Sequence, residues 1–160
     1  MRSNITRSLL VGIIAVTLVG CDSARIDKLE KQNQEILAQL HQQKAGQTYD
    51  LEAKCAEEAK RYFNENWRAD QMTAGLLYSN HYNRSLNKCF ILVRDQTFIN
   101  PKEEWHRDVT LSDVHERTDY ARFVESHSGT STSLTNCEIA GTSCTSEQDF
   151  ENRVKPYMTN

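Results

Sequence analysis

Hydrophobic residues in the middle of the chain follow first a helical and then a strand-like spacing. In residues 51–67 apolar side chains recur every three or four positions, while Glu, Lys and Arg fill the opposite face. The apolar face comprises Leu51, Cys55, Ala59, Tyr62, Phe63 and Trp67. Residues 76–83 then alternate and residues 88–95 are densely apolar, which predicts an antiparallel hairpin with a turn around Ser85.

The pattern beyond this hairpin weakens and then becomes helical again. Residues 98–107 contain Pro101 and are predicted to form a loop, and residues 108–124 two short strands around a turn at 116–119. Residues 126–135 are small and polar, which predicts a second loop. A last helix is expected over 146–158, with Ser146 and Asp149 at its start, an apolar face of Phe150, Val154 and Met158, and Pro156 ending or kinking it. The predicted fold class is α+β: in residues 51–160, a small antiparallel β-meander packed with two helices on one face.

A second helical pattern precedes this domain. In residues 24–44, apolar side chains and one amide follow a 3-4-3-4 spacing at Ile26, Leu29, Asn33, Ile36 and Leu40. This spacing matches the a and d positions of a heptad repeat and predicts a homo-oligomeric coiled coil. A solvated helical stalk without a partner is the alternative. Gly46 marks either the end of this helix or a position within a longer one.

The first twenty residues have the organisation of a secretory signal. Arg2 and Arg7 precede 11 apolar residues at 9–19, too few for the roughly 20 that a membrane-spanning helix needs. Leu18, Val19, Gly20 and Cys21 follow, and this ending resembles the lipobox of bacterial lipoproteins.

The lipobox resemblance implies a location. It implies that residues 1–20 are removed as a signal peptide and that the sulfur of Cys21 carries a diacylglycerol, in many bacteria with a further acyl chain on the amine. Residues 21–47 would then form the lipidated N-terminus and helical tether at the periplasmic side of a membrane. Asp22 favours the inner membrane over the outer. Two or more acyl chains hold a protein firmly, whereas one holds it marginally.

The remaining cysteines predict two disulfides. With Cys21 lipidated, an even set is left in an oxidising compartment: Cys55, Cys89, Cys137 and Cys144. Four cysteines allow three pairings, and the short loop between Cys137 and Cys144 favours that pair, which leaves Cys55 with Cys89. Four reduced, buried cysteines are the alternative. A zinc site is less favoured because no C-x-x-C pair is present.

Charge excludes one class of partner. Without Arg2 and Arg7 the mature chain has 17 cations against 22 acids, a formal charge of −5. The chain therefore lacks the basic surface that nucleic-acid binding requires, and no nucleic-acid partner is expected.

Candidate ligand-binding residues lie on the first strand and in the predicted turn. Tyr78, His81 and Tyr82 combine aromatic and polar groups, and His115 begins the charged segment 115–119. The tyrosines could equally be core residues. His115 and Glu116 do not form a metalloprotease motif, because Asp119 stands where H-E-x-x-H needs its second histidine. No catalytic residue, metal or cofactor is predicted.

The chain thus combines an expected lipid anchor, a helical spacer and a disulfide-bonded domain. This order favours a non-enzymatic binding or interaction module in the cell envelope. Its partner would be an envelope protein or a cell-wall ligand. One alternative is a small envelope hydrolase with a site built from His81, His115 and nearby acids. Another is a structural coiled-coil lipoprotein, in which residues 21–47 carry the function.

Overall fold

A computed structural model describes the backbone of residues 19–100 and 104–160, and the side chains of residues 23–100 and 104–160. Residues 1–18 of the expected signal peptide, and the side chains of residues 19–22, which include Cys21 and Asp22, lie outside the described part. The chain divides into two units, residues 1–46 and 47–160, which are considered separately. Among the described residues no helix is both long and apolar enough to cross a membrane.

Helix α1 spans Val19–Asn66 and is continuous through Gly46. The expected helix end at this glycine is therefore wrong, and the alternative of one longer helix is observed. A single glycine costs a helix only about 1 kcal/mol relative to alanine. The neighbouring Lys44, Ala45 and Gln47 are good helix formers, so the helix tolerates it.

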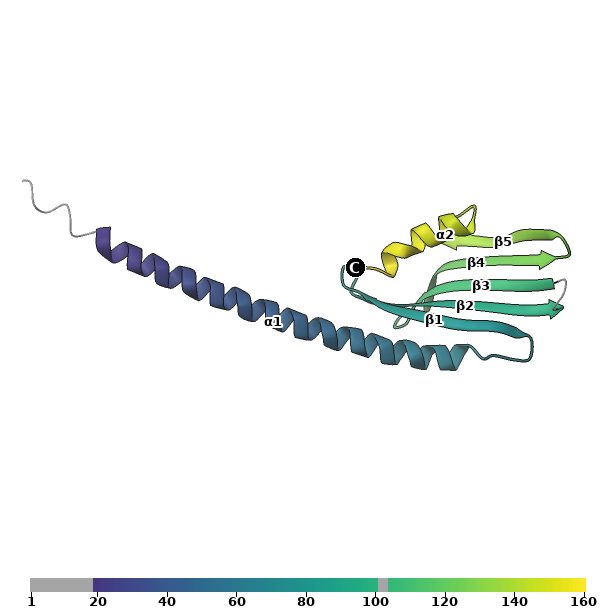
Figure 1. Cartoon of the computed structure of the whole chain (residues 1–160), viewed down its shortest axis with the longest axis horizontal. Helices are drawn as coiled ribbons and strands as arrows, with labels where there is room; N and C mark the ends of the chain where they lie inside the picture. The colour runs from purple at the N-terminus through teal and green to yellow at the C-terminus, as the bar shows by residue number, and fades with distance from the viewer. Residues whose placement is uncertain (1–18, 101–103) are drawn as a thin grey trace, which may run out of the picture. The chain divides into compact units, whose positions relative to one another are not determined.

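The second unit is an α+β domain, as predicted (Figure 1). Six antiparallel strands follow one another in chain order across a single meander sheet. After the sheet come a short helix and a 3₁₀ turn. The elements are β1 (Thr73–Asn83), β2 (Lys88–Asn100), β3 (Glu104–Asp113), β4 (Thr118–Ser128), β5 (Ser131–Ile139), β6 (Thr142–Ser143), α2 (Glu147–Val154) and η1 (Lys155–Tyr157).

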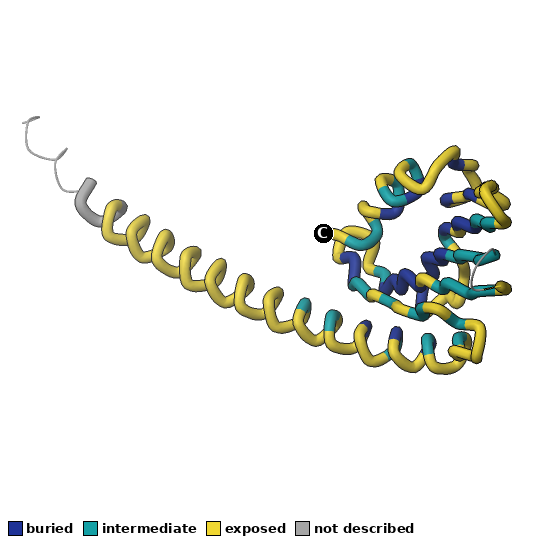
Figure 2. Tube along the Cα trace, turned by 45° about the vertical axis from the view of Figure 1, so that its right-hand side comes forward, coloured by how far each residue is buried: buried dark blue, intermediate teal, exposed yellow. Residues whose placement is uncertain are grey.

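The two helices cover opposite faces of the sheet, whereas one face was expected. On one face, α1 packs on β1 and β2 through a cluster that includes Cys55, Ala59, Tyr62, Ile91 and Val93. On the other face, α2 and η1 pack on β2–β5 through a cluster that includes Phe90, Leu111, Phe123, Phe150 and Val154. Strand β2 is apolar on both sides, and each side is buried under a different helix. Figure 2 shows the buried positions of α1 confined to its last turns.

Both predicted disulfides form, with the favoured pairing. Cys55 on α1 bonds to Cys89 on β2, with 5.4 Å between the Cα atoms. Cys137 bonds to Cys144 beside the β5–β6 turn, with 5.0 Å between the Cα atoms. In that turn Ala140 and Gly141 both have positive φ. The first disulfide fixes the helix to the sheet, and the second closes the end of the meander.

Three boundaries differ from expectation. The predicted loops at 98–107 and 126–135 are largely strand: β2 runs to Asn100, β3 begins at Glu104, and β4 and β5 form a hairpin. Residues 131–135 are mainly polar because their side chains are exposed, while their backbones pair in the sheet. The β3–β4 turn lies at 114–117, earlier than expected, and the Asp113 carboxylate accepts hydrogen bonds from the backbone N–H groups of His115 and Glu116.

The last helix begins as predicted. The Ser146 side chain accepts a hydrogen bond from the backbone N–H of Asp149, and Phe150 and Val154 are buried. The α-helix ends at Val154 and continues as the 3₁₀ turn η1, which contains Pro156. The buried Asn83 then holds the chain end, because its amide donates to the carbonyl oxygens of Pro156, Tyr157 and Thr159.

Candidate functional site

The residues predicted to bind a ligand are not brought together. Tyr78 packs on Phe63 with 4.4 Å between ring centroids, under α1. Tyr82 is buried and donates to Asn87. The Nε2 atom of His81 lies 3.2 Å from Oδ1 of Asn160, while Nδ1 of His115 lies 3.2 Å from Oε2 of Glu58 in another part of the domain.

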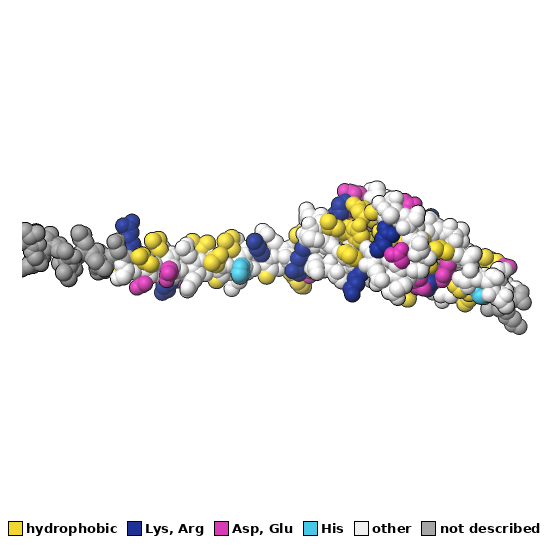
Figure 3. Space-filling model, turned by 90° about the horizontal axis from the view of Figure 1, so that it is seen from above, with side chains coloured by type: hydrophobic (Ala, Val, Ile, Leu, Met, Phe, Trp, Pro, Cys, Tyr) yellow, Lys and Arg dark blue, Asp and Glu magenta, His cyan; other side chains and the backbone are white. Residues whose placement is uncertain are grey.

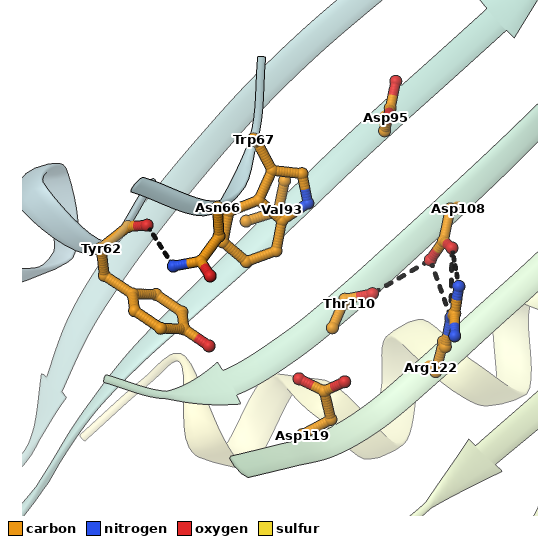
Figure 4. A pocket seen from close by; sticks show the side chains of 9 residues that line it. All are labelled: Tyr62, Asn66, Trp67, Val93, Asp95, Asp108, Thr110, Asp119 and Arg122. Carbon is orange, nitrogen blue, oxygen red and sulfur yellow. Dashed lines mark hydrogen bonds and ion pairs between the residues drawn. The ribbon is translucent and has the colours of Figure 1, made fainter. Parts of the chain in front are cut away.

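A different site forms where α1 stops short of the middle of the sheet. On the face that α1 covers, β1 and β2 are mainly apolar, but β3 and β4 carry carboxylates, hydroxyls and a guanidinium. A hollow of about 320 Å³ lies between the end of α1 and these strands. We call it the acidic pocket; its lining is Tyr62, Asn66, Trp67, Val93, Asp95, Asp108, Thr110, Asp119 and Arg122 (Figure 4).

Strand register explains how these side chains come to share one face. Thr110 lies opposite Val93 on one side and Arg122 on the other, and Asp95 lies opposite Asp108. Cross-strand partners in a sheet point to the same face. The floor of the pocket is therefore a block of side chains from three adjacent strands, built without any loop.

Asp108 and Arg122 form the most tightly bonded pair in the floor. The Nη2 atom of Arg122 lies 2.5 Å from Oδ2 of Asp108, and its Nε donates to the same carboxylate at 3.1 and 3.3 Å. Thr110 donates a further hydrogen bond to Asp108 at 3.0 Å. Hydrogen bonds from the Arg122 guanidinium to the Asp108 carboxylate raise the pKa of Arg122 above its ordinary value. Two-point bonding of this kind fixes both side chains in orientation.

The other two carboxylates are less well compensated. Asp119 accepts a hydrogen bond of 2.7 Å from Ser112. Asp95 receives one from Thr97 at 3.5 Å, the outer limit for such a contact. Burial raises the pKa of Asp95, and the carboxylates of Asp108 and Asp70 raise it further. The three aspartates and one arginine give the pocket a formal charge of −2.

Aromatic side chains at and just after the end of α1, those of Tyr62 and Trp67, form the wall above this floor. Tyr62 and Trp67 lie edge to face, with 5.5 Å between ring centroids, and Trp67 also stacks on Phe63 at 6.0 Å. Asn66 donates to the carbonyl oxygen of Tyr62 at 2.7 Å and ties down the end of the helix. Figure 4 shows Tyr62 on the helix and Trp67 on the segment that follows it, with the Trp67 ring beside Val93. The pocket thus combines fixed negative charge with aromatic surface.

An ion pair outside the pocket, between Lys88 and the buried Asp113, stabilises a turn. Asp113 is 1% exposed and accepts a hydrogen bond of 2.8 Å from Lys88, which also pairs with Glu116 at 2.7 Å. Burial opposes the ionisation of Asp113, but the Lys88 ammonium and two backbone N–H groups outweigh it and lower the pKa. These bonds hold the β3–β4 turn, where the charged segment after His115 lies.

The sequence contained a signal for the pocket that the hydrophobic pattern obscured. Asp108, Thr110 and Ser112 alternate with the buried Val109 and Leu111, so β3 has one fully polar face. A polar face on an inner strand of a sheet indicates an uncovered surface. The position of Trp67 above that face depends on where α1 ends in space, which no local pattern specifies.

No group of three or more His, Cys, Asp or Glu side chains within 23–100 and 104–160 is arranged to hold a metal ion. No protein family, no curated protein sequence and no solved structure matches this chain.

Proposed function

We propose that the protein is a lipid-tethered, non-catalytic binding module of the bacterial cell envelope, and that its acidic pocket binds a positively charged group of the ligand. The single observation that carries the ligand class is the pocket itself, with a formal charge of −2 under a wall formed by Tyr62 and Trp67. The lipobox at 18–21 supports the tether. The two disulfides support an oxidising compartment.

An amine or guanidinium suits this pocket for two physical reasons. A cation near Asp95 and Asp119 would compensate carboxylates that the protein itself compensates poorly. A cation beside Tyr62 and Trp67 would also interact with the aromatic rings, a contact that contributes about 0.5–2 kcal/mol. The amine of a cell-wall peptide or the basic side chain of an envelope protein would supply such a group.

The helical tether would set how far from the membrane the domain can bind its ligand. Residues 23–46 are helical and exposed, and 24 residues at 1.5 Å each reach about 36 Å. In this proposal the lipid fixes one end of the helix and the domain does the binding. Replacing Cys21 by Ala should abolish labelling with a fatty-acid analogue and release the protein from membranes, whereas persistent labelling would contradict lipidation at this residue.

Trp67 offers a direct readout of binding. The chain has two tryptophans, so a Trp105→Phe variant leaves Trp67, in the pocket wall, as the only indole. Its fluorescence would be followed while adding Nα-acetyl-lysine amide and, separately, the same compound with its side-chain amine acetylated. We expect a saturable change with the amine only, because the acetylated probe keeps the shape and loses the charge.

Matched variants test whether the carboxylates carry this binding. Asp95→Asn and Asp119→Asn should each weaken binding about tenfold or more. Glu57→Gln removes the same charge from an exposed position on α1 outside the pocket lining and should leave affinity unchanged. Equal responses to the two probes, or equal weakening by Glu57→Gln, would contradict the proposed ligand class.

One observation favours a hydrolase as the second candidate. Asp95 and Asp108 lie directly opposite each other in different surroundings: burial raises the pKa of Asp95, whereas the Asp108 carboxylate accepts hydrogen bonds from Arg122. Paired carboxyl groups of this kind serve as acid and base in many enzymes. Cleavage of purified cell-wall material that disappears in Asp95→Asn would favour the hydrolase over the binding module.

A further inference from the structure

The first unit exposes a hydrophobic stripe along α1. Residues 23–46 are all solvent-exposed, yet five of them are large and apolar, with exposed fractions of 44–55%. They are Ile26, Leu29, Ile36, Leu37 and Leu40. Figure 3 shows hydrophobic side chains gathered along this part of the helix between charged ones. A helix with such a stripe gains stability by burying it against a partner.

The spacing of the stripe specifies the kind of partner. Ile26, Asn33 and Leu40 occupy the a positions of a heptad, and Leu29 and Ile36 occupy the d positions. This pattern is self-complementary, because a and d side chains of one helix pack into holes between those of an identical helix. We propose that residues 23–46 of two copies pair as a parallel, in-register coiled coil.

Asn33 decides the orientation. In a parallel, in-register pair each Asn33 faces its own counterpart, so the two amides can hydrogen-bond to each other. In an antiparallel pair that brings Leu29 opposite Leu40, each Asn33 would instead lie opposite Ile36. The amides would then be buried without hydrogen-bond partners, which is unfavourable. The polar residue in the stripe therefore selects the parallel arrangement.

Charges flanking the seam are compatible with this register. In a parallel pair a g residue faces the e residue five positions later on the other helix. Arg25 at g would then face Glu30 of the second copy, an attractive pair. The next two g–e contacts join a glutamine to Leu37 and a glutamine to Lys44, so no like charges meet. Leu37 at e widens the apolar seam on one side.

The length of the seam makes the pairing dependent on confinement. Three heptads are marginal for a coiled coil free in solution. If Cys21 is lipidated, both helices start at the same surface, which raises their effective concentration and imposes the parallel direction. A dimer would also display two acidic pockets, so a ligand that repeats its charged group could bind both. The pairing itself does not depend on what the pocket binds.

Cysteine crosslinking in membranes tests the register. In the full-length lipoprotein, Leu40→Cys places a thiol at an a position, and Ala38→Cys places one at an f position on the outside of the pair. After mild oxidation, non-reducing gels should show most of Leu40→Cys as a reducible dimer and less than about a tenth of Ala38→Cys. The wild-type chain sets the background from Cys21.

Two results would overturn the proposal. Equal crosslinking of Leu40→Cys and Ala38→Cys would indicate random collisions in place of a fixed seam. Crosslinking between a Leu29→Cys chain and a Leu40→Cys chain, without crosslinking of Leu40→Cys to itself, would indicate the antiparallel arrangement. Ile26→Cys, at another a position, should behave as Leu40→Cys does. Binding of the lysine probe to Trp67 is measured separately, so failure of the dimer and failure of the pocket are distinguishable.

Discussion

The two parts of helix α1 carry similar hydrophobic patterns but have different surroundings. In the second unit, Cys55, Ala59 and Tyr62 repeat at three- and four-residue intervals and are 8% exposed or less, because the sheet covers them. In the first unit the same spacing recurs, and its four apolar members are 44–54% exposed: Ile26, Leu29, Ile36 and Leu40, with Asn33 between them. Periodicity identifies the apolar face of a helix. It does not tell whether another part of the same chain covers that face, which only the fold shows.

A matched pair of substitutions tests this difference most strongly. Ala59 is 0% exposed against the sheet, and Ala38 lies on the exposed part of the same helix. Ala59→Glu should lower the free energy of unfolding by more than about 4 kcal/mol, because it forces a carboxylate into a filled apolar layer. Ala38→Glu should change it by less than about 0.5 kcal/mol. Urea unfolding followed by circular dichroism measures both, and similar losses would show that the two parts are not distinct.

The disulfide that fixes the covered part of α1 to the sheet should contribute more than the other. Cys55 and Cys89 are 34 residues apart, and Cys137 and Cys144 are 7 apart. Chain entropy predicts losses of about 4 and about 2 kcal/mol when each pair is replaced by serines. Thermal unfolding of the two double variants gives the order. A larger loss from the Cys137–Cys144 pair would mean that fixing the helix contributes little to the domain.

The sequence predicts the elements that pack in the buried layers better than the strand ends that face water. The helical face from Cys55 to Trp67 and the doubly apolar strand β2 are strong local patterns, and burial on both sides of β2 explains its composition. The sequence predicts loops at the outer ends of β2, β4 and β5, because backbone pairing leaves no trace in the pattern of side chains that face water.

The acidic pocket was missed for a related reason. Its residues come from α1 and three strands, and only the sheet register places Asp95 beside Asp108. The composition of the first strand predicts Tyr78 and Tyr82 as binding residues, yet both pack in the layer under α1. Of the histidine candidates, His81 lies beside Asn160, and His115 lies beside Glu58 on α1. The lining of the acidic pocket follows from where α1 ends on the sheet, which is a property of the tertiary structure.

The smallest expected effect concerns Asp95. This residue lies on β2, between the part of the sheet that α1 covers and the part that it leaves open. Its pKa is raised in the folded state, so folding favours the protonated carboxyl group. The stability that this group contributes is fully present below its unfolded pKa and is lost as the pH rises through its folded pKa. Asp95→Asn should therefore match the wild type near pH 3 and unfold at a slightly higher temperature at pH 7.

We expect this gain to stay below about 1 kcal/mol, because water screens a half-buried carboxylate. The same variant should bind the lysine probe more weakly at pH 7, so stability and binding would change in opposite directions. Thermal melts at pH 3, 5 and 7, beside probe titrations at pH 5 and 7, measure both. If Asp95→Asn lowered stability at pH 7, Asp95 would belong to the covered, structural part of the domain. A gain in stability together with a loss of binding would mean that the Asp95 carboxylate destabilises the folded domain and contributes to ligand binding.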